Sequence, residues 1–284
     1  MAKYNLLRGD FNNPIFAVTF DFYSPRPHFI ILTKDGAGIE REFSRITHRQ
    51  TQQLVKAGKS VLESFKIDDG ILSIHRGAWR SETKKIHVHF CVDVESYLRV
   101  FESLKEAIPN WPNKRYVTKE WKGSTNPHSY AQNVRGYPYR SYLEKEVKAI
   151  RTNSSREPDV PLGEIQLEGG ITKIVYHPSH PKIGFVGTKP DSIEELQQVL
   201  WAMEKFAKEL SLTDLESKDE NHGCHICLYL GSVTTDGWNF TRKDGEDVVG
   251  HIVMAGFRFY HLCPVDLREN WLLAYRQSDF KCLT

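Results

Sequence analysis

Residues 85–94 read Lys-Ile-His-Val-His-Phe-Cys-Val-Asp-Val, a segment in which polar and apolar side chains alternate. This alternation predicts a β-strand, because successive side chains of a strand point to opposite faces of the sheet. His87, His89 and Cys91 therefore share one face, and the same alternation adds Asp93 to it. The intervening aliphatic and aromatic side chains line the other face, which we expect to lie on the core.

The chain before this strand predicts a hairpin, a helix and one more strand. Apolar runs over 15–22 and 28–34 flank a Ser-Pro-Arg-Pro turn, a pattern typical of two paired strands. Thr47 and Gln50 fit a capping box, and apolar residues at helical spacing follow as far as Phe65. A break at 68–70 then precedes an apolar strand beginning at Ile71.

The same order of elements returns about 150 residues later, which indicates an internal duplication. Strands are predicted at 170–176 and 183–189, and a capping box at Asp191 and Glu194 opens a helical pattern that runs to Leu210. Further strands are predicted at 225–230 and 248–260. We therefore predict an α+β fold of two tandem modules, 1–112 and 166–284, each an antiparallel sheet with one principal helix.

Composition narrows the classes of function. The chain has 284 residues and a formal charge of +2, and this near balance argues against a dedicated coat for duplex DNA. No apolar stretch is long enough for a membrane span, and no secretory signal is evident, so no membrane partner is expected. Five cysteines suggest free thiols in a reducing compartment, hence a cytoplasmic or nuclear location. No Walker loop, dinucleotide-binding glycine fingerprint or serine elbow occurs.

The connector, residues 113–165, separates the two predicted modules. Between 113 and 151 it carries an excess of six positive charges interleaved with tyrosines and one tryptophan. Such a composition suits stacking on bases and contacts to phosphates, which makes this stretch a candidate RNA-binding segment. The alternative is a solvated connector whose aromatic side chains pack onto the two modules.

The first module resembles the histidine triad (HIT) superfamily of nucleotide hydrolases and transferases. The resemblance rests on the motif His87-Val88-His89-Phe90-Cys91-Val92, on the preceding hairpin and helix, and on a strand ending His75-Arg76-Gly77. It covers roughly residues 13–94. It implies a nucleotide or nucleotide-sugar-like substrate and a covalent nucleotidyl-histidine intermediate, with no cofactor.

The resemblance also implies roles for individual residues. His89 matches the nucleophilic middle histidine, and His87 matches the histidine that orients it. Cys91 stands where the family has its third histidine, and His75 replaces the family's asparagine. The phosphate-binding step of the family has no clean counterpart, so the substrate-binding candidates are chosen from nearby polar residues: His28, His75, Arg76, Thr83 and Lys84.

The second module looks degenerate. His251 is interpreted as the match to the first histidine of the motif, while Val253 and Ala255 replace the other two. One active-looking and one silent repeat resembles the tandem architecture of the galactose-1-phosphate uridylyltransferase branch of the superfamily.

Other interpretations of these residues stay open. His87 and His89 fit ordinary half-buried sheet residues, and they also fit metal ligands, because His-x-His on a strand is a common ligand spacing. A structural zinc site is a minor alternative for Cys224, His225 and Cys227. The leading function is a nucleotide hydrolase or a nucleotidyl or phosphoryl transferase. The alternatives are a catalytically inactive nucleotide- or RNA-binding protein, or a metal-binding site.

Overall fold

The computed structural model describes residues 6–7, 13–20, 28–34, 46–79, 86–104, 159–176, 182–214, 216–217, 219–231, 244–254 and 264–277. Its elements in chain order are β1 (Phe16–Phe20), β2 (His28–Thr33), α1 (His48–Phe65), β3 (Asp69–Gly77), β4 (His87–Cys91), α2 (Val94–Ser103), β5 (Val160–Leu167), β6 (Gly170–Tyr176), β7 (Lys182–Gly187), α6 (Ile193–Glu209), η3 (Glu220–His222), β8 (Gly223–Gly231), β9 (Asp247–Met254) and α8 (Pro264–Gln277).

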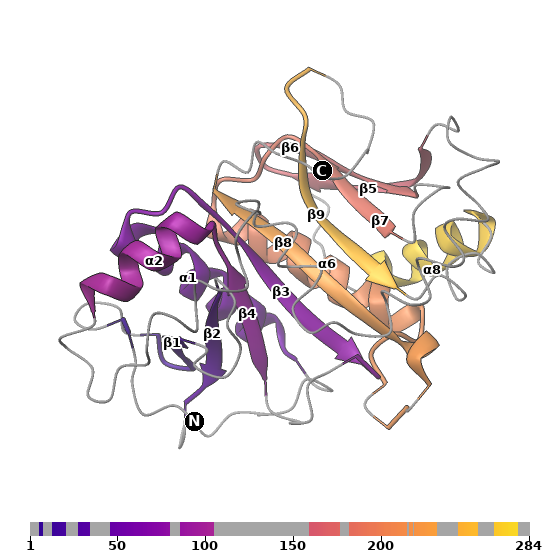
Figure 1. Ribbon diagram of the computed structural model, residues 1–284. Coiled ribbons are helices and arrows are strands. Elements are labelled where there is room, and N and C mark those ends of the chain that lie inside the picture. The colour runs from indigo at the N-terminus through magenta and orange to yellow at the C-terminus, as the bar shows by residue number, and fades with distance from the viewer. Residues whose placement is uncertain are drawn as a thin grey trace, which may run out of the picture.

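The described strands form one nine-stranded sheet in the order β1-β2-β4-β3-β8-β9-β7-β6-β5. Every neighbouring pair is antiparallel. Helices and a large antiparallel sheet in one chain agree with the α+β class that the sequence predicts. Figure 1 shows β3 and β8 side by side in the middle of this sheet.

The β3–β8 pair joins segments about 150 positions apart in the sequence. It is in register over nine residues of each strand, and the Ser73–Cys227 pair lies at its centre. Outward from this pair, the order is β3, β4, β2, β1 on one side and β8, β9, β7, β6 on the other. On each side, the first two strands in chain order form the outer hairpin, the third lies at the centre of the sheet, and the fourth lies between them. β5 is an additional edge strand.

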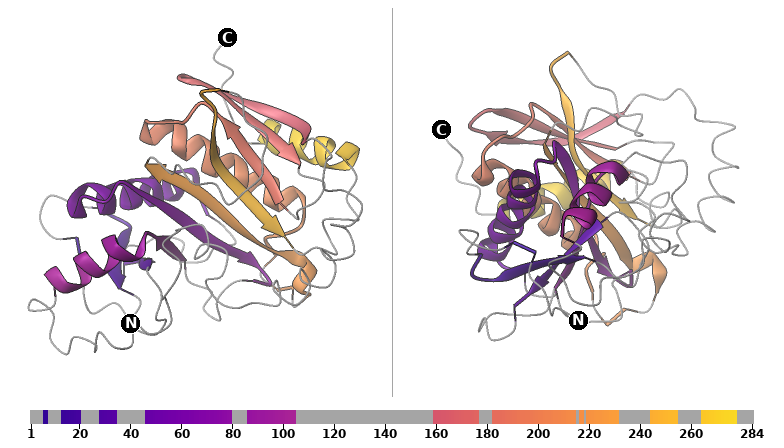
Figure 2. Two further views of the ribbon diagram at one scale, coloured as in Figure 1. Left: turned by 45° about the horizontal axis from the view of Figure 1, so that its top comes forward. Right: turned by 60° about the vertical axis from the view of Figure 1, so that its left-hand side comes forward.

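Helices α1 and α6 cover one face of the sheet and pack against each other. Both lie behind the sheet in the view of Figure 1, and Figure 2 shows them from two further sides. The face that they cover carries the aliphatic and aromatic residues of the strands, including Phe29, Leu72 and Phe90, all fully buried. We call it the helix face, and the opposite side the histidine face.

Helix α1 begins as the sequence predicts. The Thr47 hydroxyl accepts a hydrogen bond from the Gln50 backbone N–H at 3.2 Å, and the Gln50 side-chain oxygen accepts one from the Thr47 N–H at 2.8 Å. This reciprocal arrangement is a capping box, and it satisfies N–H groups that have no partner within the helix.

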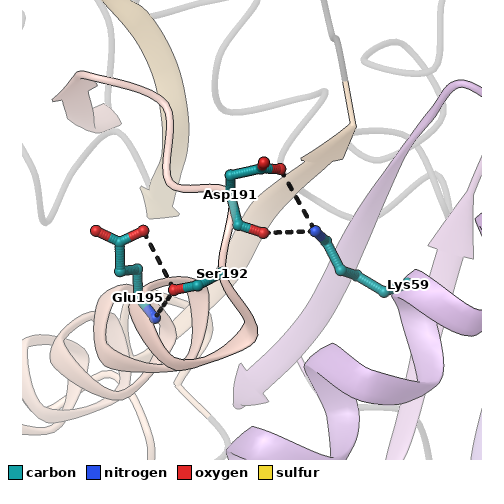
Figure 3. A network of polar contacts seen from close by, with 4 residues as sticks. All are labelled: Lys59, Asp191, Ser192 and Glu195. Carbon is teal, nitrogen blue, oxygen red and sulfur yellow. Dashed lines mark hydrogen bonds and ion pairs between the residues drawn. The ribbon is translucent and has the colours of Figure 1, made fainter. Parts of the chain in front are cut away.

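The start of α6 differs by one residue from the predicted capping box. Ser192, not Asp191, is the N-cap, and its hydroxyl accepts from the Glu195 backbone N–H at 3.1 Å. Asp191 instead receives Lys59 of α1, whose ammonium donates to the Asp191 carbonyl oxygen at 2.6 Å (Figure 3). This contact ties the beginning of α6 to α1.

The predicted strand at 86–94 is shorter in the structure. β4 ends at Cys91, and Asp93 is the N-cap of α2, with its carboxylate accepting from the Ser96 N–H at 2.8 Å. Asp93 therefore does not continue the row of His87, His89 and Cys91. A helix follows because Asp is a strong N-cap residue, and its side chain offers the chain an alternative to the sheet ladder.

The connector prediction fails at its end, because residues 160–165 belong to β5 and not to a linker. Leu162 and Ile165 are buried, but they are three positions apart, since the register shifts between Pro161 and Gly163. This bulge breaks the alternation that marks a strand in sequence. The connector up to residue 158 lies outside the described residues.

Helix α8 was not predicted from the sequence. It packs against α6 and β5, and Trp271 fills the space between them, 5.4 Å from the Phe206 ring and 6.4 Å from the Phe185 ring. None of the helices within the described ranges combines the length and the apolar character needed to cross a membrane.

Candidate functional site

Six of the chain's 12 histidines lie on the histidine face. Strand alternation and register place them there, since directly paired residues of neighbouring strands point to the same side. They come from five strands: His28 of β2, His87 and His89 of β4, His75 of β3, His225 of β8, and His251 of β9.

His89 lies at the centre of the histidines of β2, β3 and β4. Its ring centroid is 4.6 Å from that of His28, 4.6 Å from that of His87 and 5.1 Å from that of His75. The structure therefore brings together the predicted nucleophile, the predicted orienting histidine and two predicted substrate-binding histidines. His89 is 2% exposed, whereas His87 is only half-buried.

His225 extends this cluster across the middle of the sheet. It pairs directly with His75, and the two rings stack with their centroids 4.1 Å apart. The Trp79 ring also meets the His225 ring edge-on, with the centroids 5.1 Å apart. Burial lowers the pKa of His225 to about 3, because the interior disfavours the charged ring. This imidazole is therefore neutral at physiological pH.

Sequence reasoning missed His225 as a partner of His75. The alternation along each strand was visible, but the pairing of β3 with β8 is a long-range register that no local pattern encodes. The predicted internal duplication was the one available signal, because two similar sheets with open edges can join edge to edge.

Cys91 also lies on the histidine face, and its thiol is fully buried and in no disulfide. It is directly paired with His28 on one side and with Ile71 on the other. A thiol is a weaker hydrogen-bond donor than an imidazole N–H. Cys91 thus stands at the third position of the motif, but it donates a proton less readily in a hydrogen bond than a histidine there would.

Arg76 is not brought to the histidine face. It is adjacent to His75 on β3 and so points the opposite way, where Nε donates to Oε2 of Glu204 on α6 at 2.9 Å. Both side chains are 3% exposed. Of the predicted pair His75 and Arg76, only His75 contacts the histidine cluster. Thr83 and Lys84 lie outside the described residues.

The structure does not bring Cys224 and Cys227 together as zinc ligands. Cys224 Sγ lies 3.9 Å from the Leu212 carbonyl oxygen, whereas Cys227 Sγ lies 3.8 Å from Ser73 Oγ on the histidine face. Residues three apart on a strand point to opposite sides. Within the part of the chain that the structure describes, no group of three or more His, Cys, Asp or Glu side chains is placed to hold a metal ion.

His251 does not lie where the sequence comparison of the two modules puts it. It pairs with Cys227, as His89 pairs with Ser73, and Ser73 and Cys227 pair with each other. His251 is thus the counterpart of His89, the middle histidine, and not of the first histidine. The motif comparison was off by two residues because strand register, not motif spacing, decides which positions match.

Two cavities in the described part of the chain lie on the helix side of the molecule. The larger, of about 400 Å³, is lined by Lys59, Glu63 and Leu62 of α1 together with Lys189 and Asp191 before α6. The smaller, of about 240 Å³, shares Lys59 and Glu63. Both are separated from the histidine cluster by the sheet.

Comparison with known proteins finds no match in sequence and only a weak likeness in structure. No family model matches, and no curated protein matches by sequence. Among solved structures, the X-ray structure of a GalT-like protein from Arabidopsis thaliana aligns over 86% of this chain and 74% of that chain, with 10% identity and a TM-score of 0.38. A likeness at this level says nothing about the function of this chain.

Proposed function

We propose that the chain is a nucleotide hydrolase or a nucleotidyl or phosphoryl transferase that works through a covalent intermediate on His89. The observation that carries this proposal is the position of His89, whose ring is contacted by those of His28, His75 and His87 within 5.1 Å. Neutral imidazole is a competent nucleophile toward phosphorus, and neighbouring rings fix its orientation and tautomer.

The reaction follows from the places of these rings. One imidazole nitrogen of His89 attacks the α-phosphorus of a nucleotide, an N–P bond forms, and the bond to the leaving oxygen breaks. His87, on the same strand, orients the His89 ring. In this proposal His75, whose ring stacks on that of His89 at 5.1 Å, gives the leaving oxygen a proton or binds the phosphate, and Arg76 takes no part. The oxygen of water or of a second acceptor then attacks the same phosphorus, the N–P bond breaks, and the nucleotidyl group leaves His89 in its starting form.

We also propose that the nine-stranded sheet consists of two HIT-like modules, 1–112 and 166–284. The support is the matching strand order on the two sides of the β3–β8 pair and the equal placement of His89 and His251 about Ser73 and Cys227. In this arrangement the first module carries the chemistry, while the second supplies His225 to the edge of the same cluster.

The test is a turnover screen of the full chain against nucleoside phosphates and nucleotide sugars. His89→Gln should lower turnover of any substrate found by at least about 1000-fold, because the nucleophile is lost. His48→Gln is the matched control, since His48 is exposed on α1, away from the histidine face. An acid-labile phosphohistidine that forms in the wild type and not in His89→Gln would support the intermediate. Full activity of His89→Gln would reject it.

A second candidate is a nucleotide- or RNA-binding protein without turnover. It is favoured by the burial of His89 and by Cys91 in place of the third histidine. Binding without turnover across the same library would support it. The triple substitution of Tyr137, Tyr139 and Arg140, which lie outside the described residues, tests whether the connector takes part in RNA binding.

A metal-binding site at His87 and His89 is the third alternative, and elemental analysis of the purified chain tests it. Zinc or another transition metal at one equivalent per chain, lost in His89→Gln, would replace the proposal above.

A further inference from the structure

The second module has its own cluster of polar side chains on the histidine face, around His251. The Tyr229 hydroxyl and Nδ1 of His251 share a hydrogen bond of 2.6 Å, and their rings meet at 5.5 Å. His251 is fully buried and Tyr229 is 3% exposed. The proposed nucleophilic chemistry does not use this pair.

Lys182 belongs to the same cluster. It begins β7, pairs with Val253, and is therefore the diagonal neighbour of His251 on the adjoining strand. Diagonal neighbours lie about 7–8 Å apart, within reach of a lysine side chain. Lys182 lies on the same face of the sheet as its directly paired partner Val253, which is two residues from His251, and it is 7% exposed. Its charge also acts on Cys227, which is directly paired with His251: burial raises the pKa of the Cys227 thiol to about 12, while the hydrogen bond with Ser73 and the charge of Lys182 oppose that rise.

The cluster around His251 parallels the one around His89. Each central histidine has a ring contact from the neighbouring inner strand, His75 for His89 and Tyr229 for His251. On the outer strand, Ile30 is opposite His89, but Gly184 is opposite His251. The side chain that flanks His89 is therefore absent beside His251.

We propose that Lys182, His251 and Tyr229 form a binding site for an oxyanion, a phosphate group or a carboxylate, separate from the His89 cluster. When the Tyr229 hydroxyl donates to Nδ1 of His251, the ring proton lies on Nε2, which then donates to the anion. Lys182 supplies a positive charge in surroundings of low dielectric constant, where its attraction for an anion exceeds that in water. His251 in this tautomer is a donor and not a nucleophile.

The distance between the two clusters allows them to be tested separately. Three strand spacings separate His89 from His251, or about 14 Å across the sheet. The parent protein for the test is full-length His89→Gln, so that phosphate bound at His89 does not contribute. Titration with inorganic phosphate is followed by calorimetry and by ³¹P NMR in a phosphate-free buffer, and titration with acetate is the second arm.

The parent should bind phosphate or acetate, and the tighter of the two identifies the class of oxyanion. Lys182→Met should weaken binding by about 10-fold or more, because it removes a charge-assisted hydrogen bond. Tyr229→Phe should weaken it by about 3-fold or more, because the His251 tautomer is no longer fixed. Lys182→Arg keeps the charge and should bind within about 3-fold of the parent.

Two results would overturn the proposal. One is a parent that binds neither ion. The other is Lys182→Met or Tyr229→Phe with the affinity of the parent. Circular dichroism and the melting temperature check the fold of each variant, and if Lys182→Met does not fold, Tyr229→Phe decides alone, since it removes one oxygen and keeps the ring. Because every variant lacks His89, a negative result in this titration does not bear on the proposal that His89 is the nucleophile.

Discussion

Arg76 of β3 and Glu204 of α6 form an ion pair between the two predicted modules, with Arg76 Nε donating to Glu204 Oε2 at 2.9 Å. The residues are 128 positions apart, and both side chains are 3% exposed. Burial raises the pKa of the Glu204 carboxyl, and the charge and hydrogen bond of Arg76 partly offset this rise. The pair therefore couples the central strand β3 to helix α6 across 128 positions of the sequence.

Removing one partner of this pair should destabilise the fold. Arg76→Met leaves a buried carboxylate without its cation, and loss of one member of a buried pair typically costs about 3–5 kcal/mol. The double variant Arg76→Met/Glu204→Met should recover most of that loss, because no buried charge remains. Urea unfolding followed by circular dichroism measures both free energies of unfolding. A double variant no more stable than Arg76→Met alone would show that the pair is not the cause.

His75 lies on the histidine face and Arg76 on the helix face, and this difference shows what the sequence could predict. Their placement on opposite faces follows from strand alternation, so the assignment of Arg76 to phosphate binding could have been avoided by the rule that grouped His87 with His89. The hairpins, both principal helices and the strand bearing the motif follow from periodicity and capping residues. The ends of elements were less accurate, because single side chains such as Asp93 and Ser192 decide them.

The pairing of strands that are far apart in the chain could not be predicted from the sequence. His225 joins the histidine cluster only because β3 and β8 pair in one register, and His251 matches His89 for the same reason. A shift of two residues would preserve every face and every apolar pattern, so the patterns alone do not choose between registers. β5 was missed because its bulge conceals the alternation.

The burial of His225 should make the protein sensitive to acid. The pKa of His225 is about 3 in the fold, below the 6.5 of an exposed histidine, so the unfolded chain binds a proton at this residue more readily than the folded chain does. Stability present above pH 6.5 is therefore lost as the pH falls toward 3, by about 1.4 kcal/mol per pH unit for this one group.

His225→Phe tests this linkage. The ring stays beside those of His75 and Trp79, but the titrating group is gone, so the loss of stability between pH 6 and pH 4 should shrink by about 1.4 kcal/mol per pH unit. Urea midpoints at several pH values in this range measure it, and His222→Phe is the control, since His222 is only half-buried. An unchanged pH slope in His225→Phe would contradict the low pKa.

Gly77 should be irreplaceable at the end of β3. Its φ is +57°, and a Cβ there would lie 2.1 Å from the His222 carbonyl oxygen. Gly77→Ala should therefore cost more than the roughly 1–2 kcal/mol of left-handed strain alone, because backbone must also move. Gly245→Ala is the matched control: φ is +83° and nothing lies within 4 Å, so only the strain applies. Equal losses in the two variants, measured by urea unfolding, would show that the contact with His222 is relieved without cost.

The cysteines of the described residues should be inert in the folded chain. Cys91, Cys224 and Cys227 form no disulfide and have no exposed surface. Burial raises the pKa of Cys224 and raises that of Cys227 from 9.0 to about 12, so the reactive thiolate of Cys227 is about 1000-fold scarcer at pH 8 than for an exposed thiol.

Ellman's reagent measures this in Cys263→Ser/Cys282→Ser, which leaves only those three thiols. We expect no reaction in the folded protein beyond the rate of unfolding, and three equivalents in concentrated guanidinium chloride. Cys91 is the informative member, because it lies among the histidines of the proposed active site. Cys91→Ala in the same background should leave two equivalents and the same slow rate. Fast labelling of one thiol that disappears in Cys91→Ala would mean that the His89 cluster opens to solvent on the timescale of the reaction.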